Sequence, residues 1–251
     1  MSSEKSLAIV LRVIDFSETS VIATLFTEDF GKIGALAKGA RRPKGPFEAA
    51  LDLLAVCRIV FLHKTSDALD LLTEAKLERR FRSAGRDLAR LYAGYYVAEL
   101  LNDLTDPGDP HPELFHCANQ TLFDLDHGEP VPSLVLHFEV SLLQAIGSIP
   151  SLDACVSCGT AVTPAGRVAF SAIAGGVLCH QCRSGQRQVL SVSGGVIRTL
   201  QQFADSEDNA WRRLDLDRRV RGELRGVMNH YLANLLGHRP RMFKYLGMLA
   251  S

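Results

Sequence analysis

Four cysteines in the second half of the chain constrain its fold more than any other feature. They form two Cys-x-x-Cys pairs separated by 20 residues, and their members are Cys155, Cys158, Cys179 and Cys182. The two-residue gap lets both sulfurs of a pair reach one ion at about 2.3 Å, so the spacing predicts a closed, four-thiolate zinc site. The alternative is two unrelated pairs of buried cysteines, but such paired spacing rarely arises without a ligand role.

Glycines and short apolar runs between the two pairs predict the local fold around them. Gly175 and Gly176 precede the second pair, where a tight turn is needed. Residues 167–170 and 176–178 have the composition of two short strands of a ribbon hairpin. We therefore expect a zinc finger over residues 152–186.

Acidic and basic residues are unevenly distributed along the 251-residue chain, whose formal net charge is zero. Residues 1–82 carry a net charge of +2, residues 83–154 carry −9, and residues 155–251 carry +7. This split predicts separate basic and acidic faces. The basic faces would suit nucleic acid, and the acidic one would repel it.

Apolar residues make up 47% of the chain, but no apolar stretch approaches the length of a membrane span. The first residues are polar and contain no apolar signal region. We therefore expect a cytoplasmic protein whose grouped cysteines bind metal in a reducing compartment.

The hydrophobic pattern changes near residue 82. Before it, strand-like apolar segments separated by turn residues predict a small β-barrel; they cover residues 7–14, 20–26, 33–37, 53–62 and 68–75. After it, helical spacing dominates; the expected helices cover residues 86–104, 113–125, 133–146, 195–204 and 220–236. The fold class is therefore α+β and multidomain.

Two sets of basic residues are candidates for contact with phosphates. The first is an exposed loop rich in glycine and proline, with Lys38, Arg41, Arg42 and Lys44. The second lies near the C-terminus, where Arg239, Arg241 and Lys244 have no nearby acid in sequence. The alternative for both sets is an ordinary solvated surface, because a cluster of charges alone is weak evidence for nucleic-acid binding.

A further basic group consists of Arg218, Arg221 and Arg225, which share one face of an expected helix. The alternative is that this face is solvated and that its arginines pair with acidic neighbours such as Asp217 and Glu223.

Catalytic motifs are scarce, so we expect a protein that is not an enzyme. The chain contains no phosphate-binding loop of the G-x-x-x-x-G-K-[ST] type and no G-x-S-x-G elbow. The triplet His111-Pro112-Glu113 is similar to the H-x-E of zinc deaminases. However, Ala154 stands where those enzymes have proline, and a closed four-thiolate site leaves no position for water.

Taken together, these features resemble the RecO family of bacterial recombination mediators over nearly the whole chain. The resemblance rests on the strand set that ends in residues 38–44, the helical middle, the four cysteines, and the closing Gly237-His238-Arg239-Pro240. It implies an OB-fold, nucleic-acid-binding domain over residues 1–80. It also implies a helical domain over residues 81–251 that carries the zinc finger.

The resemblance further implies a function in DNA repair and recombination. The family binds single- and double-stranded DNA, anneals complementary strands, and helps to load RecA onto strands coated with single-stranded-DNA-binding protein. RecR and the acidic, apolar tail of single-stranded-DNA-binding protein are the implied partners, in the bacterial cytoplasm at the nucleoid. Members without the four cysteines exist, so the zinc ion is expected to be structural.

The acidic tail of that partner needs cations, and we expect Arg218, Arg221 and Arg225 to supply them. A competing class is a zinc-ribbon transcription or translation factor that binds nucleic acid without annealing it.

Overall fold

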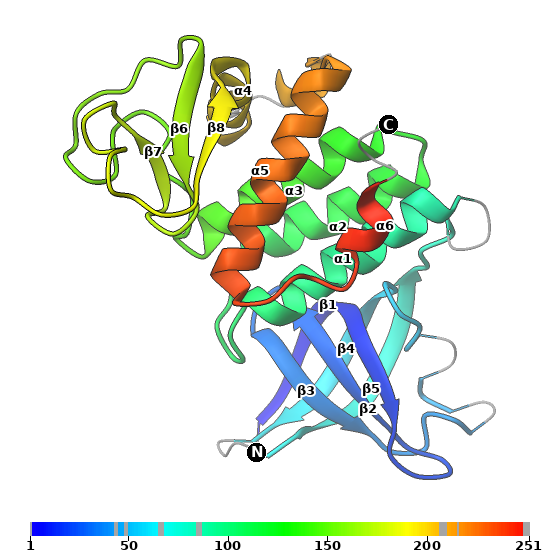
Figure 1. Cartoon of the computed structure of the whole chain (residues 1–251). Coiled ribbons are helices and arrows are strands. Elements are labelled where there is room, and N and C mark those ends of the chain that lie inside the picture. The colour runs from blue at the N-terminus through cyan, green and yellow to red at the C-terminus, as the bar shows by residue number, and fades with distance from the viewer. Residues whose placement is uncertain are drawn as a thin grey trace. The chain divides into compact units, whose positions relative to one another are not determined.

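The computed structural model describes residues 2–42, 45–47, 50–64, 68–83, 87–205, 210–214 and 216–247. The chain forms two compact units, residues 1–129 and residues 130–251 (Figure 1). The expected boundary after residue 80 falls inside the first unit. Division of the chain at that point stays a prediction.

Five strands of the first unit close into a barrel, drawn in blue to cyan in Figure 1. They are β1 (Ser2–Asp15), β2 (Val21–Thr27), β3 (Gly31–Ala37), β4 (Val56–His63) and β5 (Asp70–Arg79). Strand β1 pairs antiparallel with β2 and β4, and β3 closes the ring through a short parallel pairing with β5. This five-stranded barrel confirms the expected OB-type domain.

Alternating burial explains why these segments form a barrel. In β3, Ile33, Ala35 and Ala37 point into the core while the residues between them are half-buried. The period of two is that of a strand with one face turned inward. In β1 the pairing register shifts between Val10 and Arg12, and a bulge of this kind strengthens the twist that closure requires.

Two helices, α1 (Leu88–Leu104) and α2 (Pro112–Asp126), complete the first unit. The side chain of Asp87 caps α1 by accepting a hydrogen bond from the backbone N–H of Ala89 at 2.9 Å. At the other end, the ammonium group of Lys32 on β3 donates to the carbonyls of Asn102 and Thr105, each at 2.5 Å. Burial lowers the pKa of Lys32, and nearby acids oppose that shift. The contact ties the barrel to the negative end of α1.

The second unit combines helices with a three-stranded sheet. Its helices are α3 (Val131–Ala145), α4 (Gly194–Ala204), the 3-10 helix η2 (Ala210–Arg213), α5 (Arg218–Leu236) and α6 (Phe243–Leu246). Its sheet has the order β7–β6–β8, with β6 (Arg167–Ser171), β7 (Gly176–Leu178) and β8 (Val189–Ser193). The expected hairpin is present, and β8 adds a third strand, so this sheet continues beyond residue 186.

A buried ion pair joins α3 to α5. Glu139 is fully buried, and its two carboxylate oxygens accept hydrogen bonds from the guanidinium of Arg225 at 2.6 and 3.0 Å. A bidentate pair is the geometry in which such a burial is tolerated. Among the described residues, no helix has the length and apolar character that crossing a membrane requires.

Candidate metal centre and nucleic-acid interfaces

The structure brings the four cysteines of the sequence motif together in the second unit. Their sulfur atoms all lie within 4.8 Å of one another. The Sγ atoms of Cys158 and Cys179 are 3.8 Å apart. Four sulfurs at about 2.3 Å from one ion in a tetrahedron would be about 3.8 Å apart, so this donor set fits zinc.

Backbone contacts hold the first cysteine pair against the sheet of β7, β6 and β8, which we call the finger sheet. The N–H of Val156 donates to the carbonyl of Val177 on β7 at 3.0 Å, and the N–H of Cys155 donates to Thr160 at 2.8 Å. Ser151 pairs with Gly176, where any side chain on the glycine would overlap the backbone of Ser151. The expected glycine-dependent turn before the second pair is found at Gly175, which has φ +86° and ends the turn before β7, whereas Gly176 already lies on that strand.

Hydrogen bonds favour the thiolate form at two of the four sulfurs, those of Cys155 and Cys158. The backbone N–H of Cys179, together with those of Ser157 and Cys158, lowers the pKa of Cys155 to about 6. The hydroxyl of Thr160 lowers the pKa of Cys158, whereas hydrogen bonding to Cys158 raises the pKa of Cys182 to about 12. Four sulfurs this close cannot all be thiolates unless a cation lies between them. The cluster therefore has the donor set of a metal-binding site.

The first basic surface lies on the barrel unit, where Lys38, Arg41 and Arg42 are all exposed. Gly39 has φ +74°, a value that favours glycine, and its carbonyl accepts a hydrogen bond from the N–H of Arg42 at 3.0 Å. This turn presents the three cations to solvent, as expected. Lys44, the fourth predicted contact, lies outside the described residues.

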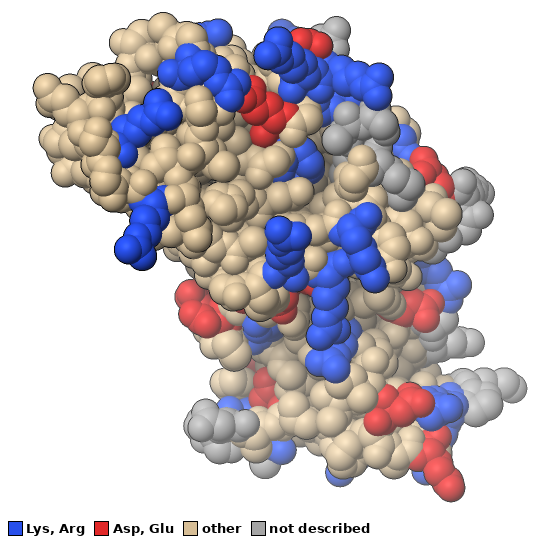
Figure 2. Space-filling model, viewed as in Figure 1, with Lys and Arg blue, Asp and Glu red and all other residues tan. Residues whose placement is uncertain are grey.

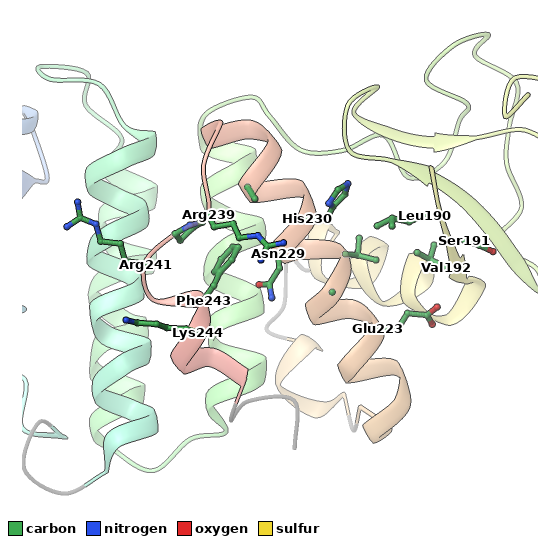
Figure 3. Close-up of a pocket in the computed structure, with 14 residues that line it drawn as sticks. Leu190, Ser191, Val192, Glu223, Asn229, His230, Arg239, Arg241, Phe243 and Lys244 are labelled. Carbon is green, nitrogen blue, oxygen red and sulfur yellow. The ribbon is translucent and has the colours of Figure 1, made fainter. Parts of the chain in front are cut away.

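The second basic surface borders a cavity of about 810 Å³ in the second unit. It is lined by β8, by α5 and by the tail, from which Arg239, Arg241 and Lys244 contribute (Figure 3). Arg239 extends toward α5, whereas Arg241 and Lys244 extend away from β8. Figure 2 shows more basic than acidic side chains on the visible face of this unit. The structure thus gathers the three predicted tail cations around one hollow.

The three arginines of α5 have different environments. Arg218 is exposed, whereas Arg221 is half-buried and donates to the carbonyl of Leu216 at 3.1 Å. Arg225 is bound to Glu139. Arg221 and Arg225 line a small apolar pocket, whose other members are Pro132, Leu136, Leu216, Leu224 and Met228. The structure therefore brings two of these three arginines together, and Arg218 is not in the lining.

Comparison with known families covers almost the whole chain. The profile described as Recombination protein O N terminal matches residues 1–81, and that described as Recombination protein O C terminal matches residues 85–242. The chain belongs to the RecO family.

Individual members of the RecO family are similar over nearly their full length. A DNA repair protein RecO from Rhodopirellula baltica is 41% identical, covering 96% of this chain and 97% of the relative. One from Moorella thermoacetica is 33% identical, covering 97% of this chain and 90% of the relative. The resemblance predicted from the motifs is thereby confirmed.

Sequence reasoning did not identify Glu139, which is buried in this structure as the partner of Arg225. It lies within residues 83–154, the acidic segment that is expected to repel DNA. The signal that was available is its position inside an apolar helical run over residues 134–143. A single carboxylate among core residues needs a cation to neutralise it. Arg225 supplies that cation from α5, next to the buried residues Leu224 and Met228.

Proposed function

We propose that this chain is a DNA-binding recombination mediator. It binds single- and double-stranded DNA, anneals complementary strands, and helps to load RecA onto DNA coated with single-stranded-DNA-binding protein. Membership of a family whose relatives are named as DNA repair proteins supports this proposal. The observation on the structure that carries it is the exposed cationic turn on the OB-type barrel.

The cationic turn acts on the phosphate backbone. Lys38 and Arg42 are exposed cations on a turn that needs no rearrangement to reach solvent. Neutralising phosphates releases condensed counterions, which supplies affinity without reading sequence. Such a surface binds both single strands and duplexes, as a mediator requires.

The cavity lined by β8, α5 and residues 239–244 provides a second DNA surface. Apolar side chains such as Val192, Val227 and Phe243 line this cavity together with its basic side chains. Within the described part of the chain, Nε2 of the lining residue His230 is buried without a hydrogen-bond partner. In this proposal the phosphates of a DNA strand contact the basic side chains, and its bases pack against the apolar ones.

Annealing follows from the two surfaces without a catalytic residue. Cations lower the repulsion between two strands, and holding both on one protein raises their effective concentration. The protein in this account makes and breaks no covalent bond.

A single structural Zn²⁺ ion completes the second unit in this proposal. Cys155, Cys158, Cys179 and Cys182 would hold it, and no fifth position is left for a reacting water. The ion would fix the finger sheet, because metal binding energy at such a site is folding energy.

Protein partners complete the role. We assign RecR and the acidic tail of single-stranded-DNA-binding protein as partners, in the bacterial cytoplasm at the nucleoid. The apolar pocket between α3 and α5 marks where the apolar end of that tail would insert once the two helices move apart, with Arg221 beside it for a carboxylate. Arg225 already satisfies Glu139, so Arg221 is the better cation for this contact.

Reversing the charge at Arg221 separates the two kinds of ligand. Arg221→Glu should weaken binding of a labelled acidic, apolar-ended peptide about tenfold or more, because a charge-assisted contact is replaced by repulsion. Binding of a labelled oligonucleotide should change much less. Fluorescence anisotropy on the purified full-length protein measures both.

Arg219→Glu is the matched control, since it makes the same charge change at an exposed position of α5 outside the pocket. It should leave peptide binding intact. Equal loss of both ligands in the Arg221 variant would point to one shared surface and contradict the assignment.

A further inference from the structure

Phe16 exposes an aromatic ring to solvent on the barrel unit. It directly follows β1, and 60% of its surface is exposed. Within the described part of the chain, its ring makes no aromatic or cation–π contact. Leaving a phenyl ring in water forfeits the stabilisation that burial would give, so folding of the barrel does not explain this placement.

The loop that carries Phe16 is held in one conformation. The backbone N–H groups of Phe16 and Ser17 both donate to the carbonyl of Ser20, at 3.0 and 3.1 Å. The N–H of Ser20 donates back to Oγ of Ser17 at 3.2 Å. The ring is therefore presented on an ordered turn, and little entropy is lost when a ligand covers it.

Hydrogen bonds fasten this loop to the cationic turn. The N–H of Arg41 donates to the carbonyl of Thr19 at 3.0 Å, and the N–H of Gly39 donates to Oγ of Ser20 at 3.4 Å. The guanidinium of Arg41 also pairs with Asp15, the residue before Phe16, at 2.9 Å. Residues 15–20 and 38–42 therefore form one surface, which we call the ring-and-cation surface.

The charges on the ring-and-cation surface are nearly balanced. Asp15 forms an ion pair with Arg41, and Glu18 adds a second negative charge on the loop. Together with Lys38 and Arg42, this leaves the surface with a small net positive charge. A surface that relied on charge alone would bind weakly here. An exposed ring adds an uncharged contact that only an unpaired base can use fully, because bases in a duplex are already stacked on each other.

We infer that Phe16 is a stacking platform for an unpaired base of single-stranded nucleic acid, with the neighbouring phosphates on Lys38 and Arg42. The inference rests on the proposed DNA binding and adds to it a preference for single strands over duplex. Loops at this end of an OB-fold are common places for oligonucleotide contact.

The test compares Phe16→Ala with the wild-type protein, using fluorescence anisotropy with a labelled oligo(dT) and a labelled duplex. Affinity for oligo(dT) should fall about 5- to 100-fold, the size expected when one base no longer stacks on an aromatic ring. Affinity for the duplex should change less than about twofold, and the salt dependence should not change, because no charge is removed. Phe16→Leu should behave like the alanine variant, whereas Phe16→Trp should bind oligo(dT) at least as well as the wild type.

Phe123→Ala is the matched control, because it removes another exposed phenyl ring, 40% exposed on α2 and stacked on His127. It should bind oligo(dT) normally. The Phe16→Trp variant gives a direct readout as well. The chain has one natural tryptophan, Trp211, which is only 3% exposed. Oligo(dT) should therefore quench the added fluorescence and leave the wild-type signal unchanged.

Two outcomes would overturn the inference while the proposed function stands. One is normal oligo(dT) affinity in Phe16→Ala, and the other is an equal loss for single strand and duplex. Failure of the wild-type protein to bind any DNA would instead overturn the proposed function, and the inference with it.

Discussion

Replacing Cys155 with serine is expected to abolish metal binding and to lower the free energy of unfolding by more than about 4 kcal/mol, the range associated with loss of a metal. The wild-type protein should hold about one zinc ion per chain. Cys155 is 2% exposed and packs with Ala169 and Leu178 of the finger sheet, so the loss reaches the core of that sheet. At about 2–4 °C per kcal/mol, the unfolding midpoint should fall by at least roughly 8 °C.

Elemental analysis and thermal unfolding by circular dichroism measure these two effects. Cys179→Ser should behave like Cys155→Ser, because both remove a thiolate of the cluster. Cys117→Ser is the control, since Cys117 is a half-buried cysteine on α2 outside the cluster. Full metal content and an unchanged midpoint in both cluster variants would show that the four cysteines are not a metal site.

Removing the cationic turn should weaken DNA binding by on the order of 100-fold near 0.15 M salt. The variant replaces four residues with alanine: Lys38, Arg41, Arg42 and Lys44. For each phosphate that the variant no longer neutralises, the slope of log affinity against log salt should fall by about 0.7–0.9. Because Asp15 already pairs with Arg41, the total change in slope should stay below that of four fully neutralised phosphates. The barrel should remain folded, since the described side chains of the turn are exposed.

The control for this variant removes four exposed cations from strands or strand ends of the same barrel unit: Lys5, Arg58, Lys76 and Arg80. It changes the net charge equally, so the two variants differ in where the charge was removed. Oligonucleotide titrations at several salt concentrations compare them. An equal slope for the turn variant and the wild type would mean that the turn is only a solvated loop.

Features that depend on neighbouring residues could be predicted from the sequence. The two sulfurs of a Cys-x-x-Cys pair are close in any tight turn, so their spacing alone indicated a shared ion. The alternation in β3 likewise belongs to a single strand. For this reason the barrel, the helical part and the four-cysteine cluster agree with expectation.

Features that depend on distant residues could not be predicted in the same way. Arg225 and Glu139 are 86 positions apart, and each resembles an ordinary charged residue of a helix until α3 and α5 pack together. The joining of Arg41 to Thr19 depends on the pairing of β2 with β1 and β3. The sequence could therefore predict a basic loop, but not the aromatic ring fastened beside it.

Strand annealing tests the central claim most directly. Two complementary oligonucleotides, one with a donor dye and one with an acceptor dye, are mixed with the purified protein in the absence of nucleotide and of other proteins. The account predicts that energy transfer rises faster than for DNA alone, and that the variant without the cationic turn is slower than the wild type. If both strands are bound yet pair no faster than free DNA, the protein is a nucleic-acid-binding factor without annealing activity, and the account is contradicted.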